Sequence, residues 1–147
     1  MSGGTTLSPS VVIEYNVTDG TSTRLQDMSE GRNYHGCTLI SDDNMTAVIV
    51  AGGFRGGYFL KSAELYDLST ALWRQAGELN YARDLTSMAT LPGGAVVMGG
   101  YNGRVMRSVE QFQIPDNTWT PIRDLKQARK SLAVLNLLPE EIVNFNI

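Results

Sequence analysis

Short apolar and β-branched runs alternate along the chain with clusters of Gly, Asp, Asn and Ser. One such cluster, Ser41-Asp42-Asp43-Asn44, separates two β-prone runs. Because Asp and Asn tolerate left-handed backbone angles, this arrangement predicts a hairpin. A Gly-rich loop over 54–61 follows, and a further pair of runs with alternating faces surrounds Ser69-Thr70. The strands predicted for this group are 34–40, 46–50, 62–68 and 72–75.

The same order of features returns 46 residues later, where Glu64 is repeated as Glu110 and Trp73 as Trp119. A repeat at a fixed spacing of this size indicates stacked units of a repeat architecture. The segment 125–138 also fits a weak helical pattern, so a helix is the competing prediction there. The strands predicted for the second group are 85–91, 95–98, 109–114 and 118–121.

Each copy carries a Gly-Gly doublet, an aromatic residue 12 or 13 positions after it, and a Trp seven residues further on. This pattern resembles kelch repeats. The resemblance implies an all-β fold in which four-stranded antiparallel blades form part of a β-propeller, with the first strand of each blade nearest the central channel. The matching strings are Ala51-Gly52-Gly53-Phe54 with 62–67 and Trp73, and Met98-Gly99-Gly100-Tyr101 with 108–112 and Trp119.

Incomplete copies flank the two complete ones, since Tyr15 lies 51 residues before Tyr66 and 142–146 lies 46 after 96–100. In total the chain holds about three blades, whereas propellers close with four to eight. We therefore expect further blades, either from a longer chain or from a second copy. The predicted divisions are the second half of a blade over 1–30, complete blades over 31–79 and 80–126, and the first half of a blade over 127–147.

Charge and composition exclude several partners. Lys+Arg 12 against Asp+Glu 15 gives a net charge of -3, which predicts no binding to nucleic acid or to an anionic membrane. No apolar run reaches the length of a membrane span, and no signal peptide is recognisable, so we expect a soluble, cytoplasmic protein. The single cysteine, Cys37, is expected to be a small buried hydrophobic residue.

Residues suited to catalysis are few. His35 and Cys37 form a lone His-x-Cys pair, which predicts neither a metal site nor an activated nucleophile. The run 52–57 lacks the Gly-Lys-Ser/Thr ending of a phosphate-binding loop. We expect no cofactor and no enzyme activity. The alternative is a fragment of a carbohydrate-active kelch propeller enzyme of the epimerase type, whose active residues would lie in other blades.

Three arginines recur at the expected junctions between blades: Arg32, Arg83 and Arg129. Each could pair with Glu64 or Glu110 and with loop carbonyls through its planar, five-donor head. We interpret them as structural, with ligand contact as the second interpretation.

The resemblance implies a non-catalytic module for protein–protein interaction, similar to the substrate-recognition propeller of a cullin-type ubiquitin ligase adaptor or to an actin-associated scaffold. A protein or peptide ligand would lie at the propeller mouth, on the loop after each Gly-Gly doublet and the loop entering the next blade. Phe54 and Tyr101 could instead only cover the neighbouring inner strand. The partner-binding residues implied are Asn33, Tyr34, Phe54, Arg55, Tyr58, Tyr101, Asn102 and Arg104, with Asp84 and Lys130 beside them.

Overall fold

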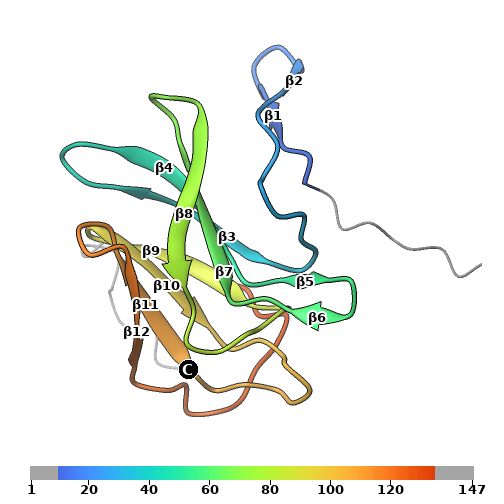
Figure 1. The fold of residues 1–147 in the computed structure, drawn as a ribbon, viewed down its shortest axis with the longest axis vertical. Helices are drawn as coiled ribbons and strands as arrows, with labels where there is room; N and C mark the ends of the chain where they lie inside the picture. The colour runs from blue at the N-terminus through green and yellow to red at the C-terminus, as the bar shows by residue number, and fades with distance from the viewer. Residues whose placement is uncertain (1–9, 135–147) are drawn as a thin grey trace, which may run out of the picture.

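The structure is a computed structural model that describes residues 10–134, and it is all-β as predicted. Two four-stranded antiparallel sheets and two small hairpins make up this part of the chain (Figure 1). The first sheet has the order β3-β4-β7-β8 and the second has the order β12-β11-β10-β9, so each follows the simple up-and-down path of a propeller blade. The strands of the first sheet are β3 Gly36–Ser41, β4 Thr46–Ala51, β7 Ser62–Asp67 and β8 Leu72–Glu78.

The second sheet repeats the first along the sequence. Its strands are β9 Ser87–Leu91, β10 Gly94–Met98, β11 Val109–Gln113 and β12 Thr118–Ile122. The conserved spacing of aromatic residues has a direct structural counterpart, because Tyr66 pairs with Trp73 across β7 and β8, and Phe112 pairs with Trp119 across β11 and β12. The ring centroids lie 5.2 Å apart in both pairs.

The tight turns form where the sequence predicted them. The carboxylate of Asp42 accepts hydrogen bonds from the backbone N–H groups of Asn44 and Met45, which fixes the β3–β4 turn. The carboxylate of Asp67 accepts from the N–H and hydroxyl of Ser69 in the β7–β8 turn. These side-chain bonds add to the backbone bonds of the turns, from Asp42 N–H to the Met45 carbonyl and from Ala71 N–H to the Asp67 carbonyl.

The hydrophobic core lies between the two sheets. Ile40, Ile49 and Leu65 from the first sheet pack in one buried cluster with Val97 and Phe112 from the second. Two hydrogen bonds cross the same junction: Trp119 Nε1 donates to the Ala76 carbonyl at 2.8 Å, and the hydroxyl oxygens of Thr38 and Thr90 lie 2.9 Å apart. The two sheets therefore face one another as neighbouring blades do.

A hairpin of β1 Ile13–Tyr15 and β2 Ser22–Arg24 lies beside the first sheet on the side away from the second (Figure 1). The linker after it is bonded to the first sheet, because Trp73 Nε1 donates to the carbonyl of Gln26 at 2.8 Å. This hairpin lies within 1–30, for which the sequence predicts the second half of a blade, and that division stays a prediction.

Three predictions are corrected or limited by the structure. The predicted loop over 54–61 contains a hairpin, β5 Phe54–Arg55 and β6 Tyr58–Phe59, because Gly56 and Gly57 both adopt positive φ and form a two-residue turn. No helix forms over 125–134, and the rest of the competing helix lies outside the described residues. The predicted strand over 142–146 also lies outside them.

Cys37 is exposed rather than buried. Gly36, Thr38 and Ile40 occupy the face of β3 that meets the second sheet, so the alternation of the strand places Cys37 on the opposite face. There it lines an apolar pocket with residues of the N-terminal hairpin, including Ile13. Partial burial nevertheless raises the pKa of the Cys37 thiol, which makes it a weak nucleophile at neutral pH.

Candidate functional site

The antiparallel path brings all the long connections of the two sheets to one end, which we call the loop end. The β4–β7 and β10–β11 connections and the β8–β9 linker lie there, whereas the tight turns lie at the other end. Backbone bonds hold the connections to the linkers: Asn33 N–H donates to the Phe54 carbonyl at 3.0 Å, and Asp84 N–H donates to the Tyr101 carbonyl at 3.0 Å. The two repeats thus build the same bridge twice.

The glycine doublets make these bridges possible. Gly53 and Gly100 both have φ of +108°, where L side chains are strained. A Cβ on Gly53 would lie 2.8 Å from the Asn33 carbonyl oxygen, and one on Gly100 would lie 2.6 Å from the Asp84 oxygen. Glycine is required here because two backbones meet without room for a side chain.

A chain of aromatic rings joins the two repeats at the loop end. Phe54 and Phe59 make an edge-to-face contact with centroids 5.4 Å apart, and Phe59 makes another with Tyr101 at 5.8 Å. The ammonium of Lys130 lies 4.8 Å from the centre of the Tyr101 ring. The predicted residues Phe54 and Tyr101 are therefore brought together, through Phe59.

Phe59 was missed by the sequence analysis. The signal was present, because the two-residue Gly-Gly pair in Phe54-Arg55-Gly56-Gly57-Tyr58-Phe59, with β-prone aromatic residues before and after it, is typical of a hairpin. A plain loop over 54–61, as predicted from the sequence, does not place Phe59 opposite Phe54. The hairpin pairs these two residues directly.

The other predicted site residues differ in exposure. Tyr58 at the tip of the hairpin is 75% exposed and Tyr34 is 63% exposed, so both offer ring surface to solvent. Arg55 is exposed but lies 3.5 Å from the carboxylate of Glu30. Asn33 is half-buried and engaged through its backbone. The exposed tyrosines therefore provide more free surface at this end than Asn33 and Arg55.

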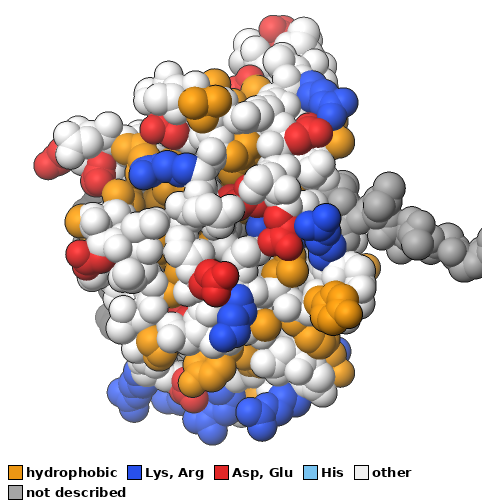
Figure 2. Space-filling view, viewed as in Figure 1, with side chains coloured by type: hydrophobic (Ala, Val, Ile, Leu, Met, Phe, Trp, Pro, Cys, Tyr) orange, Lys and Arg blue, Asp and Glu red, His pale blue; other side chains and the backbone are white. Residues whose placement is uncertain are grey.

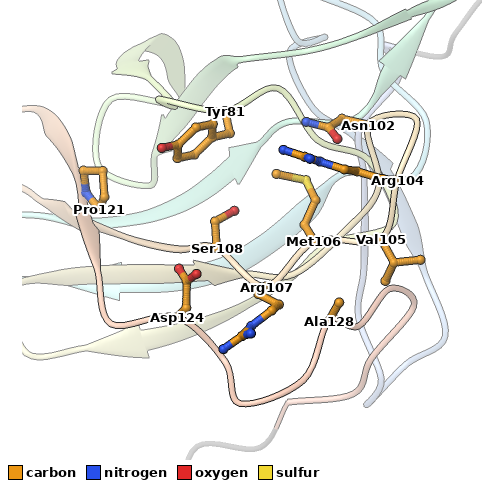
Figure 3. Close-up of a pocket in the computed structure, with 10 residues that line it drawn as sticks. All are labelled: Tyr81, Asn102, Arg104, Val105, Met106, Arg107, Ser108, Pro121, Asp124 and Ala128. Atoms are coloured by element: carbon orange, nitrogen blue, oxygen red, sulfur yellow. The ribbon is translucent and has the colours of Figure 1, made fainter.

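Asn102 and Arg104, which follow Tyr101 in the β10–β11 connection, line a pocket of about 420 Å³ on the second sheet (Figure 3). Tyr81 closes one side of it, and Arg107 and Asp124 lie across from Arg104 in the close-up. Of the predicted residues, only Asn102 and Arg104 belong to this pocket. Sequence spacing could not find it, because its wall comes from three separate connections.

Besides the two arginine–glutamate pairs, Asp84 is buried and His35 is half-buried near the loop end. Burial raises the pKa of Asp84, although the charge of Lys130 acts in the opposite direction, and Asp84 Oδ1 has no hydrogen-bond partner. Burial, together with the charge of Arg32, lowers the pKa of His35, so its imidazole is neutral at pH 7. Neither group has the partners of an acid–base pair.

A structural role was predicted for all three recurring arginines, and the side chains of two of them, Arg32 and Arg83, make the predicted contacts. Arg32 lies 2.8 Å from Glu64 and donates to the carbonyls of Gly52 and Ser62. Arg83 lies 2.7 Å from Glu110 and donates to the carbonyls of Gly99 and Ser108. Arg129 is exposed and donates to Gln127 instead.

Within residues 10–134, no cluster of three or more His, Cys, Asp or Glu side chains could hold a metal ion. The same part of the chain contains no helix long and apolar enough to cross a membrane.

Comparison with known proteins agrees with the repeat pattern. The family model for the kelch motif matches residues 46–80 and 82–126. The kelch repeat-containing protein kel-10 of Caenorhabditis elegans is 31% identical over 112 residues, which cover 72% of this chain. A kelch repeat and BTB domain-containing protein of the same species is 32% identical over an equal length. The match spans 19% of the length of each of these two relatives.

Proposed function

Because this chain belongs to the kelch repeat family, we propose that it is a non-catalytic protein-interaction module whose ligand lies on the loop end of its blades. Kelch repeat proteins generally act by binding other proteins. The proposal goes further by assigning the contact surface to Asn33, Tyr34, Phe54, Arg55, Tyr58, Tyr101, Asn102 and Arg104.

The observation that carries this proposal is the chain of rings that links two blades at one end. The contacts from Phe54 through Phe59 to Tyr101 hold the base of the β5–β6 hairpin against the next blade, and Tyr58, one residue nearer the tip, is exposed on this supported hairpin. Rigid aromatic residues with a polar tip are enriched at the energetic centres of protein interfaces. At the opposite end of the first sheet, the carboxylates of Asp42 and Asp67 are already engaged in hydrogen bonds to the backbone of their own turns.

A finer assignment follows from the relatives. One of them carries a BTB domain together with its kelch repeats. We propose that this module is the substrate-recognition part of such an adaptor, of the kind used by cullin-type ubiquitin ligases, and that it acts in the cytoplasm.

Site-specific photo-crosslinking tests the proposed surface. A photoreactive amino acid is placed at Tyr58 in the full chain, and a matched one at Thr70, which is exposed in the β7–β8 turn at the opposite end. After irradiation in cells, crosslinked proteins are identified by mass spectrometry. We expect a defined set of adducts from position 58 that is absent from position 70.

A second variant tests whether the adducts at position 58 depend on the aromatic support of the hairpin. Tyr101→Ala removes the ring that supports the hairpin and contacts Lys130. With the probe still at position 58, we expect this change to reduce the adducts several-fold, while circular dichroism shows an unchanged β-sheet content. Equal crosslinking from both ends of the blades would contradict the proposal.

A further inference from the structure

Half of the basic residues of the chain gather around the second blade. Six of the twelve Lys and Arg residues lie in the β10–β11 connection or in the segment after β12. We call this set the basic arc. Figure 2 shows Lys and Arg side chains collected along the lower edge of the molecule, where Figure 1 places these two connections. The basic arc comprises Arg104, Arg107, Arg123, Lys126, Arg129 and Lys130.

Backbone bonds hold the two connections side by side. Leu125 N–H donates to the Arg107 carbonyl at 2.9 Å, and Arg107 Nε donates to the Leu125 carbonyl at 2.9 Å. Arg129 N–H donates to the Met106 carbonyl, and its own carbonyl accepts from Gly100 N–H. The charges of the basic arc are thus kept together by the fold, although they are far apart in the sequence.

The charge of the basic arc is not compensated within residues 10–134. None of its six side chains forms an ion pair there, whereas Arg24, Arg32, Arg55 and Arg83 each lie within 4.0 Å of a carboxylate. Glu110 is already occupied by Arg83. Asp124 lies on the same segment and lines the pocket, and the charge of Lys130 acts on the buried Asp84, but neither carboxylate forms an ion pair with the arc.

The pocket described above lies within this surface. Arg104 and Arg107 line it together with the amide of Asn102 and the phenol of Tyr81 (Figure 3). Guanidinium groups form paired, charge-assisted hydrogen bonds with carboxylates, and the amide and phenol add neutral donors. Asp124 is the one acidic side chain on its wall.

We propose that the basic arc binds an acidic, Asp- and Glu-rich segment of the partner protein, with one carboxylate seated in the pocket between Arg104 and Arg107. This inference rests on the proposed function and names the chemistry of the partner. An acidic peptide fits better than a nucleic acid, because the chain carries a net charge of -3 and half of its Lys and Arg residues gather around one blade. A long polyanion would also meet the acidic remainder of the molecule.

Fluorescence anisotropy with the full chain tests the proposal. The probe is a fluorescein-labelled ten-residue peptide of alternating Glu and Gly, and the control peptide carries Gln in place of Glu. We expect saturable binding of the Glu peptide at least tenfold tighter than that of the Gln peptide. Affinity should fall steeply between 50 and 200 mM salt, roughly as expected for contacts between exposed charges.

Variants locate the contact. Arg104→Glu and the double change Arg104→Ala with Arg107→Ala should each weaken Glu-peptide binding at least tenfold. Arg74→Ala, which removes an exposed arginine of β8 outside the basic arc, should leave binding within twofold. Circular dichroism verifies that each variant folds; Arg104→Glu keeps the test valid if loss of the Arg107 bond to Leu125 disturbs the loop.

Three results would overturn the inference: no saturable binding of the Glu peptide, equal binding by the arc variants, or tighter binding of a 20-nucleotide single-stranded DNA than of the peptide. The proposed function fails separately, through loss of position-specific crosslinks at Tyr58. If the Arg104→Glu variant still gives adducts at position 58 and the chain binds no Glu peptide, the proposed interaction module stands. The proposal of an acidic partner then fails.

Discussion

The guanidinium of Arg83 lies 2.7 Å from the carboxylate of Glu110, and both side chains are buried. The same residue serves the preceding blade through its backbone, because its carbonyl accepts a hydrogen bond from Gly53 N–H at 2.7 Å. Arg83 therefore fixes the linker to both of the blades that it joins. Arg32 repeats the ion pair with Glu64 one blade earlier.

Removal of one member of this buried pair should be strongly destabilising. Arg83→Met leaves the Glu110 carboxylate buried without its cation, and we expect the free energy of unfolding to fall by about 3–5 kcal/mol. Urea denaturation followed by circular dichroism measures the change. Arg74→Met, an exposed arginine, is the matched control and should cost less than about 0.5 kcal/mol. A similar loss in both variants would show that the buried pair has no special role.

Acid should weaken the fold through Glu64. Burial raises the pKa of this carboxyl, but hydrogen bonds from Ser29, Arg32 and the Glu30 backbone outweigh burial and bring the pKa below its ordinary value of 4.5. Stability from ionised Glu64 is therefore complete above pH 4.5 and is lost as the pH falls through the lower, folded-state pKa. Urea midpoints between pH 7 and pH 3 should fall less steeply in Glu64→Gln than in the unmodified chain. Parallel slopes would contradict this.

Asp84 should act in the opposite direction. Its pKa is raised above its ordinary value of 3.8 by burial, so its contribution to stability is complete below pH 3.8 and is lost as the pH rises through the folded-state pKa. Asp84→Asn removes a buried charge whose Oδ1 has no partner. We expect this variant to be more stable than the unmodified chain at pH 7, by about 1 kcal/mol for each unit of pKa shift removed, and equal to it at pH 3. Thermal unfolding at both pH values provides the measurement.

The second glycine of each doublet should not tolerate a side chain. In Gly100→Ala the new Cβ would lie 2.6 Å from the Asp84 carbonyl oxygen, so the bridge between linker and loop must shift. Gly103→Ala is the matched control, because Gly103 also has positive φ, +96°, but nothing within 4 Å of the position of a Cβ. Backbone strain of about 1–3 kcal/mol applies to both variants, and the clash applies only to Gly100→Ala. The melting temperature should therefore fall clearly further for Gly100→Ala.

Trp119 should report on the contact between blades. Its ring is buried and its Nε1 donates to the Ala76 carbonyl of the neighbouring sheet. Trp119→Phe keeps the apolar contact with Phe112 but leaves that carbonyl without its donor, which costs about 1–3 kcal/mol. Trp73→Phe removes the equivalent bond to Gln26 at a half-buried position, and its smaller effect in urea denaturation provides the comparison. Equal losses would mean that burial of the bond does not matter.

The sequence was sufficient for the features that depend on local spacing. The turn at Asp42, the eight strands of the two sheets, and the pairing of Arg83 with Glu110 follow from residue types repeated at a fixed period. Phe59 required the Gly56-Gly57 turn to be recognised as a hairpin. The exposure of Cys37 depends on which face of β3 the next blade covers. The basic arc forms because hydrogen bonds hold two separate connections together, which the sequence does not reveal. The net charge of -3 gave no sign of a positive surface.

The N–H group of Gly53 donates to the Arg83 carbonyl, and that of Gly100 donates to the Arg129 carbonyl. These two hydrogen bonds have a consequence for amide hydrogen exchange. Each of these two N–H groups is donated to a linker rather than within a sheet, so its protection depends on the junction and not on the strands beside it. Exchange at Gly53 therefore measures how often the two described blades separate, exchange at Gly100 measures how often the segment after β12 leaves the second blade, and strand amides measure unfolding of the blade itself. The same chain carries a separate kinetic reporter for each event.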